Sequence, residues 1–133
     1  MNAVLALKGR CLNPGEAEAR LLVIPRSVSF YGELEEGFDE PVVLLVASTR
    51  GSTVAPYVIY RLARRGRAPR GIGIWGRAEP MIVAGCVLAG IPLADMLGRA
   101  ASSSLEELAR LDCIARLECS ERGGAALLTL RCG

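Results

Sequence analysis

The sequence contains no histidine. This absence excludes Ser–His and Cys–His nucleophile pairs, histidine-ligated metals, imidazole general bases and phosphohistidine carriers. Any chemistry carried by this chain must therefore use hydroxyl, thiol, carboxylate or guanidinium groups, or groups that a partner brings.

Lysine, aromatic residues and long apolar runs are scarce as well. Lys8 is the single lysine, against 15 arginines, and only 5% of the residues are aromatic. Because no stacking motif is interleaved with the basic residues, we expect no nucleic-acid partner. The longest apolar stretch, Met81–Leu93, contains two glycines and a proline and is too short to span a bilayer. We therefore expect no membrane segment.

Length and composition point to an ordinary globular protein. The N-terminal apolar residues reach Lys8 and Arg10 without a small-residue cleavage site, so no signal peptide is expected. A content of 51% hydrophobic and 23% charged residues excludes disordered, collagen-like and mucin-like chains. The 133 residues show no internal repeat, which predicts one domain over residues 1–133. We expect this domain to be cytoplasmic.

Five cysteines are spread over the chain without a C-x-x-C pair. Their odd number and the lack of a secretory signal predict reduced, mostly buried thiols. Their spacing, without histidine, is not typical of a metal site. If an iron–sulfur cluster is involved, we expect it outside this chain. The cysteines are Cys11, Cys86, Cys113, Cys119 and Cys132.

Strands alternate with helices in the middle of the chain, and strands dominate both ends. The β-branched apolar run at 41–47 predicts a strand buried on both faces. Caps and prolines predict three helices, which are 53–65, 79–90, and a third from a Ser103–Glu106 capping box to Leu111. Other strands are predicted at 3–7, 17–24 and 71–75, with a C-terminal hairpin of 113–119 and 125–131. This order predicts an α/β domain with mixed sheets.

Arginines cluster at the end of the first predicted helix. Cations there complement the helix dipole, so a solvated helix end is one interpretation. A docking surface for an acidic partner is the alternative. The cluster consists of Arg61, Arg64, Arg65, Arg67 and Arg70.

The segment Arg50-Gly-Ser-Thr53 lies where the buried strand turns into this helix, the position where α/β folds bind ligands. Pro56 fits only in the first helical turn, because later in a helix its ring clashes with a backbone carbonyl. The cap is therefore Thr53 or a later residue, which leaves the Ser52 hydroxyl free of capping. Arg50 and the helix amides, with Gly51 and Thr53 beside them, suit an anion. A turn that merely starts the helix is the alternative.

Two other patterns carry weaker functional signals. Gly71-Ile-Gly-Ile-Trp-Gly76 matches G-x-G-x-x-G, but its glycines interrupt a strand, so tight packing explains them better than dinucleotide binding. Glu79 is expected to complement the dipole of the second helix, and Asp95 to cap the segment after it. Neither has a paired carboxylate that would indicate acid–base catalysis.

Three blocks of the sequence, taken together, resemble the small subunit of the aconitase X family. The blocks are Gly9–Ala17, Arg50–Tyr60 and Ala68–Leu93. The resemblance covers about residues 7–97 and the terminal hairpin. The Gly-Ser-Thr and Ile-Pro-Leu motifs are its most specific parts.

The resemblance implies a swivelling β/β/α domain that closes over a large subunit. The large subunit would carry the iron–sulfur cluster, of the 4Fe-4S type, on its own cysteines, with no metal bound by this chain. The implied activity is that of a hydro-lyase. It removes water from a small phosphorylated carboxylate, (R)-5-phosphomevalonate, to give trans-anhydromevalonate 5-phosphate in an archaeal route to isoprenoids. The catalytic serine of the family falls on Ser52, as proton acceptor.

The chain departs from the family pattern between its second and third predicted strands. Many members carry a longer segment with a histidine, where this chain has only residues 31–40. Related members dehydrate cis-3-hydroxy-L-proline, which remains an alternative substrate. The alternative that is not an enzyme is an anion-binding or regulatory domain with the same fold.

Overall fold

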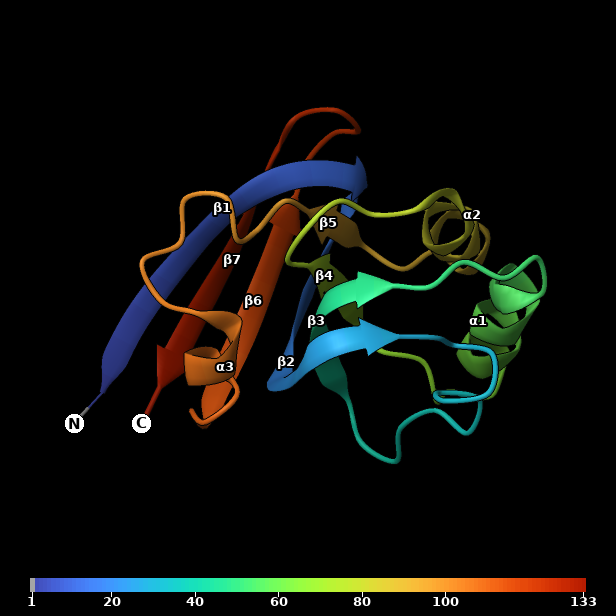
Figure 1. The fold of residues 1–133 in the computed structure, drawn as a ribbon, viewed down its shortest axis with the longest axis horizontal. Coiled ribbons are helices and arrows are strands. Elements are labelled where there is room, and N and C mark those ends of the chain that lie inside the picture. The colour runs from blue at the N-terminus through green and yellow to red at the C-terminus, as the bar shows by residue number, and fades with distance from the viewer. Residues whose placement is uncertain (1) are drawn as a thin grey trace.

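The computed structural model describes residues 2–133, and within them seven strands close into a barrel (Figure 1). The strands are β1 (Ala3–Asn13), β2 (Gly15–Val28), β3 (Val42–Thr49), β4 (Gly71–Ile74), β5 (Leu93–Asp95), β6 (Cys113–Cys119) and β7 (Ala125–Cys132). Around the barrel they follow the order β1-β5-β4-β3-β2-β6-β7. Strands β2 to β5 run parallel to one another, whereas β1, β6 and β7 join antiparallel.

Helices α1 (Ala55–Arg64) and α2 (Pro80–Ala89) pack together and cover the outside of the parallel strands (Figure 1). Each helix has a proline in its first turn, where the missing N–H costs nothing. Gly90 ends α2 with a φ of 73°, in the left-handed region that glycine adopts readily. Within residues 2–133 no helix has the length and apolar character needed to cross a membrane.

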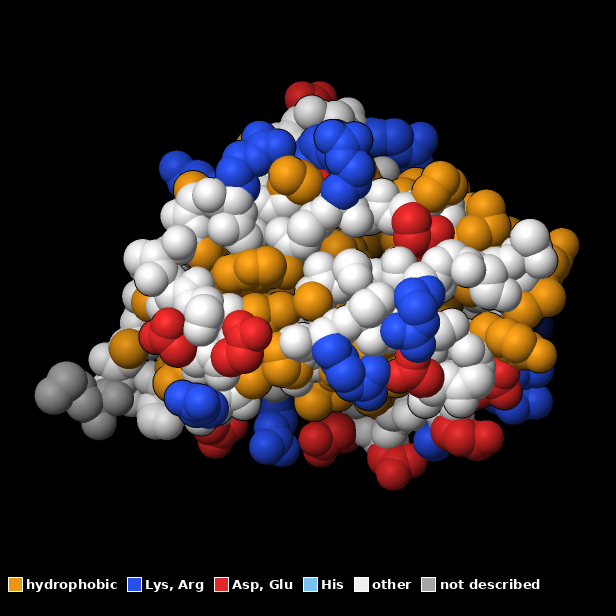
Figure 2. Space-filling view, viewed as in Figure 1, with side chains coloured by type: hydrophobic (Ala, Val, Ile, Leu, Met, Phe, Trp, Pro, Cys, Tyr) orange, Lys and Arg blue, Asp and Glu red, His pale blue; other side chains and the backbone are white. Residues whose placement is uncertain are grey.

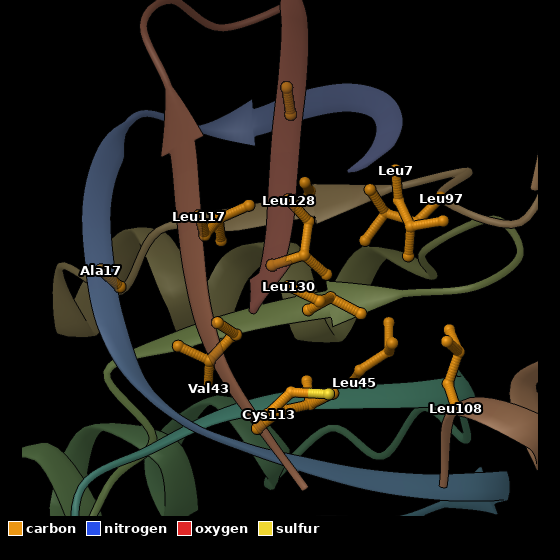
Figure 3. Packing of buried hydrophobic residues seen from close by; sticks show 14 of the residues in the cluster. Leu7, Ala17, Val43, Leu45, Leu97, Leu108, Cys113, Leu117, Leu128 and Leu130 are labelled. Carbon is orange, nitrogen blue, oxygen red and sulfur yellow. The ribbon is translucent and has the colours of Figure 1, made fainter. Parts of the chain in front are cut away.

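The alternation of side chains along β3 divides the apolar residues into two layers. Val43 and Leu45 point into the barrel, where they meet leucines from β1, β6 and β7 (Figure 3). Leu44 and Val46 point outward and pack beneath α1 and α2. Because all four are fully or almost fully buried, the prediction of a strand buried on both faces is confirmed.

The α/β class, the helices and the C-terminal hairpin agree with the sequence analysis, and the mixed sheet is closed into one barrel. The first strand was predicted to end at Leu7, before Gly9. In the structure β1 passes through Gly9 and continues to Asn13. A Cβ at Gly9 would lie 2.3 Å from the backbone oxygen of Asp95. The glycine therefore allows β1 and β5 to approach each other within a continuous strand.

Helix α3 (Leu105–Leu108) is shorter than predicted and begins one residue later. Its capping box joins Ser104 and Glu107, not Ser103 and Glu106. Both pairs fit the capping pattern equally well in the sequence. The register in the structure buries Leu105 and Leu108 against the barrel core, which decides between the two.

The prediction of reduced cysteines is wrong. Among the described residues, disulfides join Cys11 to Cys119 and Cys113 to Cys132, and Cys86 is a free, buried thiol. Cys113 and Cys132 face each other in the register of β6 and β7. The odd number of cysteines and the missing secretory signal are arguments about the redox compartment. Disulfide pairing depends instead on which cysteines the fold brings together, and composition does not reveal that. Burial raises the pKa of the Cys86 thiol and keeps it protonated.

Candidate functional site

The carboxyl ends of the parallel strands lie along one rim of the barrel. Val28 at the end of β2 is paired with Thr49 at the end of β3, and Val46 is paired with Ile74 at the end of β4. The Arg50–Thr53 loop leaves this rim after β3 and leads into α1. In open α/β sheets, ligands bind in the crevices at such strand ends.

Ser52 lies in the loop just before α1 and is partly exposed. The N-cap is Val54, so the prediction from Pro56 that the cap is Thr53 or later is confirmed. As predicted, the Ser52 hydroxyl does not cap α1, which has no side-chain cap. Its Oγ accepts a hydrogen bond of 3.3 Å from the Val54 amide, and its carbonyl accepts one of 3.0 Å from the Ala55 amide.

The hydrogen bond from Val54 has a chemical consequence for Ser52. An amide that donates to the hydroxyl oxygen stabilises negative charge on that oxygen and leaves the hydroxyl proton available for donation. The position at the start of a helix adds the positive end of the helix dipole. The loop therefore presents an oxygen on which negative charge would be partly stabilised by the backbone.

Arg50 is held by a carboxylate of the same chain. Its Nη1 donates to the Ser27 carbonyl at 2.9 Å, and its Nη2 forms an ion pair with Glu33. Glu33 also accepts from Arg26 at 2.6 Å and from the Ser29 amide at 3.2 Å. A substrate anion would have to compete with Glu33 for the Arg50 guanidinium. The sequence analysis missed Glu33, which lies in a polar segment that carries no motif.

Gly51 and Thr53 flank the serine with different roles in the structure. A Cβ at Gly51 would lie 2.7 Å from Oε2 of Glu79, so a side chain here would displace this carboxylate oxygen. Glu79 is the N-cap of α2 and accepts from the amides of Met81 and Ile82 at 2.7 and 2.9 Å. It thus goes beyond general dipole complementation, the role predicted for it. Thr53 is exposed.

Glu79 also connects the strand ends to each other. The Thr49 hydroxyl at the end of β3 donates to its Oε1 at 3.0 Å. One carboxylate therefore fixes the last residue of β3, the first turn of α2 and the backbone path at Gly51. The Ser52 loop is supported by this contact on one side and by the contact between Arg50 and Glu33 on the other.

A second polar contact on the rim is formed by Arg10 and Asp95. The Arg10 guanidinium donates two hydrogen bonds to the Asp95 carboxylate, at 2.9 and 2.7 Å, and the Ala78 amide donates a third at 2.9 Å. Asp95 is fully buried, so it does not cap the next segment as predicted. The hydrogen bond with Asp95, and then its charge, raise the pKa of Arg10. An aspartate within the apolar run Leu93–Leu97 was a signal of this pair in the sequence.

The residues of this chain do not fit an iron–sulfur cluster. Within residues 2–133, no three His, Cys, Asp or Glu side chains come together as metal ligands. Four of the five cysteines are joined in disulfides, and the remaining thiol, Cys86, is buried on the inner face of α2. Clusters of this kind are held by thiolates, which these side chains do not supply.

Comparison with known proteins identifies the fold. Residues 40–117, more than half of the chain, match the model of the aconitase X swivel domain. This chain belongs to the aconitase X family. The aconitase X structure of Thermococcus kodakaraensis in its holo-form superposes with a TM-score of 0.74 at 25% identity, over 93% of this chain and 98% of that one. The resemblance read from the three sequence blocks is thereby confirmed.

Two similar proteins carry the same name as each other. The phosphomevalonate dehydratase small subunit of Aeropyrum pernix is 49% identical over 102 residues, which are 71% of this chain and 76% of the relative. That of Thermococcus onnurineus is 35% identical, over 68% of this chain and 80% of the relative. The aconitase X chain described here is thus similar to archaeal proteins along most of their length.

Proposed function

We propose that this chain is the small subunit of a phosphomevalonate dehydratase. The reaction removes water from (R)-5-phosphomevalonate and gives trans-anhydromevalonate 5-phosphate. The observation that carries the proposal is the 49% identity to the Aeropyrum pernix small subunit, together with membership in the aconitase X family. The names of the relatives favour phosphomevalonate over cis-3-hydroxy-L-proline as the substrate. Residues 1–133 are proposed to act as one swivel domain.

Ser52 is proposed to accept the proton. In this elimination, a base takes a proton from the carbon next to the carboxylate, a double bond forms to the neighbouring carbon, and the hydroxyl on that carbon departs as hydroxide, which becomes water by taking up a proton from the solvent. The carbon-bound proton would move to the deprotonated Oγ of Ser52, which becomes a neutral hydroxyl. The Val54 amide and the adjacent helix start support this role, because both stabilise the anionic form of the oxygen.

Arg50, Gly51 and Thr53 are proposed to contact the substrate around Ser52. Arg50 suits the carboxylate or phosphate because its planar fork matches two anionic oxygens. Its contact with Glu33 would be exchanged for the substrate on binding. Gly51 leaves the backbone open to the substrate on a loop that is fixed by Glu79.

The remaining chemistry is proposed to belong to a large subunit. The relatives are named small subunits, and such a subunit works with a larger partner. The family is that of aconitase-like dehydratases, and we place the iron–sulfur cluster, as 4Fe-4S, on the large subunit. The lack of a suitable ligand set in residues 2–133 supports this division. The complex would be a heterodimer or a larger assembly.

The proposal is tested by anaerobic reconstitution with the large subunit encoded in the same genome. Each of the two substrates, 5-phosphomevalonate and cis-3-hydroxy-L-proline, is followed by NMR with the purified complex. We expect a new vinylic proton signal from phosphomevalonate only. Consumption of the proline derivative alone would reject the substrate, and a complex with intact cluster that converts neither would reject the proposed activity.

A further inference from the structure

The rim that carries Ser52 continues across β4 and β5 to β1. Arg10 is paired with Asp95 in the antiparallel register of β1 and β5, so β1 runs on past the end of β5. Arg77 follows β4, and Arg99 follows β5. Lys8 lies two residues before Arg10 and projects from the same outer face of β1. We call Lys8, Arg10, Arg77 and Arg99 the basic rim.

Three carboxylates along this rim are already satisfied, whereas Glu121 in the β6–β7 turn is exposed beside Gly124. Asp95 is buried against Arg10 and the Ala78 amide. Glu79 caps α2, and Glu33 is shared by two arginines. By contrast, Lys8, Arg77 and Arg99 have no carboxylate oxygen within 4.0 Å among residues 2–133. Lys8, Arg77 and Arg99 outnumber the exposed Glu121, so the outward charge of the rim is positive.

Three of these cations surround a hollow in the surface. A cavity of about 400 Å³ is lined by Lys8, Arg10 and Arg99, and by the backbone of Gly123 and Gly124 in the β6–β7 turn. Figure 2 shows Lys and Arg side chains gathered below one acidic side chain at the top of the view, the end at which Figure 1 shows the β6–β7 turn. Charges of the same sign around a hollow reinforce each other's electrostatic field.

We propose that the basic rim docks onto a carboxylate-rich surface of the large subunit. The inference rests on the proposed function, because a partner that brings a reaction centre to Ser52 must cover this rim. Since the basic rim is continuous with the Ser52 loop, the same partner surface would lie over both. Its unpaired cations would meet opposite charge there, because like charges or apolar groups would leave them desolvated without compensation.

The arginines at the far end of α1 provide a matched control. Arg64 and Arg65 are exposed, lie at the last turn of the helix, and also lack a carboxylate partner among residues 2–133. Lys8→Glu/Arg99→Glu and Arg64→Glu/Arg65→Glu therefore make the same change of charge on two different surfaces. Circular dichroism and thermal unfolding of each variant establish that both chains are folded.

The experiment measures association of each chain with the immobilised large subunit, without substrate, over a series of salt concentrations. We expect Lys8→Glu/Arg99→Glu to slow association on the order of tenfold and to flatten its salt dependence, while Arg64→Glu/Arg65→Glu leaves both unchanged. Equal effects of the two variants, or none from either, would overturn the docking surface. A wild-type chain that does not associate at all would overturn it together with the proposed function, whereas association without dehydration would affect the function alone.

A small anion is the other ligand that such a hollow suits. Titration of the isolated chain with inorganic phosphate, followed by NMR, distinguishes it from a protein surface. We expect no saturable shift at the amides of Gly123 and Gly124 below millimolar phosphate. Saturable binding there, combined with normal association of Lys8→Glu/Arg99→Glu, would replace the docking surface by an anion site.

Discussion

The parallel and antiparallel halves of the barrel are held together by different means. Strands β6 and β7 form a hairpin that is closed by Cys113–Cys132, and Cys11–Cys119 joins it to β1. Strands β3, β4 and β5 have no disulfide and are covered by the helices packed over them. The loop that carries Ser52 leaves from this parallel half, after β3. The fold thus places its candidate site on the half whose ends are fixed by side-chain hydrogen bonds, beside a half that is fixed covalently.

The largest expected effect is the loss of dehydration when the chain that carries the Ser52 loop is assayed without its partner. Because the proposed function gives this chain the base and gives the large subunit the groups that assist the leaving hydroxyl, the isolated chain should give no detectable dehydration. The measurement is NMR of 5-phosphomevalonate with this chain alone, with the large subunit alone, and with both. Turnover by the isolated chain would show that the site is complete without a partner.

The antiparallel half should respond to reduction. Opening both disulfides releases constraints on long loops of the unfolded chain, so the melting temperature should fall on the order of 10–20 °C. A thiol titration of the unreduced, denatured chain should find the one free cysteine, Cys86. The control is a variant with alanine at all four paired cysteines, on which the reductant should have no effect. An unchanged melting temperature for the wild type would reject the two covalent links.

The contact between Arg10 and Asp95 joins the two halves, and its two partners should not be equivalent. Arg10→Ala leaves a carboxylate that is fully buried without its counter-ion, which should cost about 2–4 kcal/mol of unfolding free energy. Asp95→Asn leaves an arginine that is 42% exposed and can be hydrated, so about 1–2 kcal/mol is expected. Denaturant unfolding of both variants measures the difference. A larger loss for Asp95→Asn would contradict this account of the pair.

The smallest effect is expected at Arg50. Arg50→Lys keeps the charge but loses the planar fork, so kcat/KM should fall about tenfold, mainly through KM. Glu33→Gln, which releases the arginine from its ion pair, is expected to lower KM instead. Steady-state kinetics of the reconstituted complex separates the two. An Arg50→Lys enzyme with full kcat/KM would remove Arg50 from the substrate site.

The sequence predicted the elements of both halves more closely than the links between them, for physical reasons. The apolar run at 41–47 and the position of Pro56 each allow few conformations, so β3 and the start of α1 were predicted closely. The disulfides, by contrast, depend on which strands become neighbours when the barrel closes. No local pattern encodes that the ends of β1 and β6 meet across the sheet.

The candidate site was predicted only in its central loop. Ser52 and its neighbours stand at a strand-to-helix turn that the pattern reveals, whereas their supports come from distant segments. Glu33 lies in a loop without a motif, and the role of Glu79 toward Gly51 depends on how α2 packs beside α1. Asp95 carried a signal, a charge within an apolar run, but its partner Arg10 is 85 residues away in the sequence.

The most direct test of the account replaces the oxygen that is proposed to accept the proton. Ser52→Ala and, as a matched control, Ser102→Ala at an exposed position outside the Ser52 loop are each combined with the large subunit under anaerobic conditions. With complex formation verified by gel filtration, Ser52→Ala should lower kcat about 10³-fold or more, and Ser102→Ala should leave it unchanged. A Ser52→Ala complex with wild-type turnover would contradict the assignment of the base to this chain.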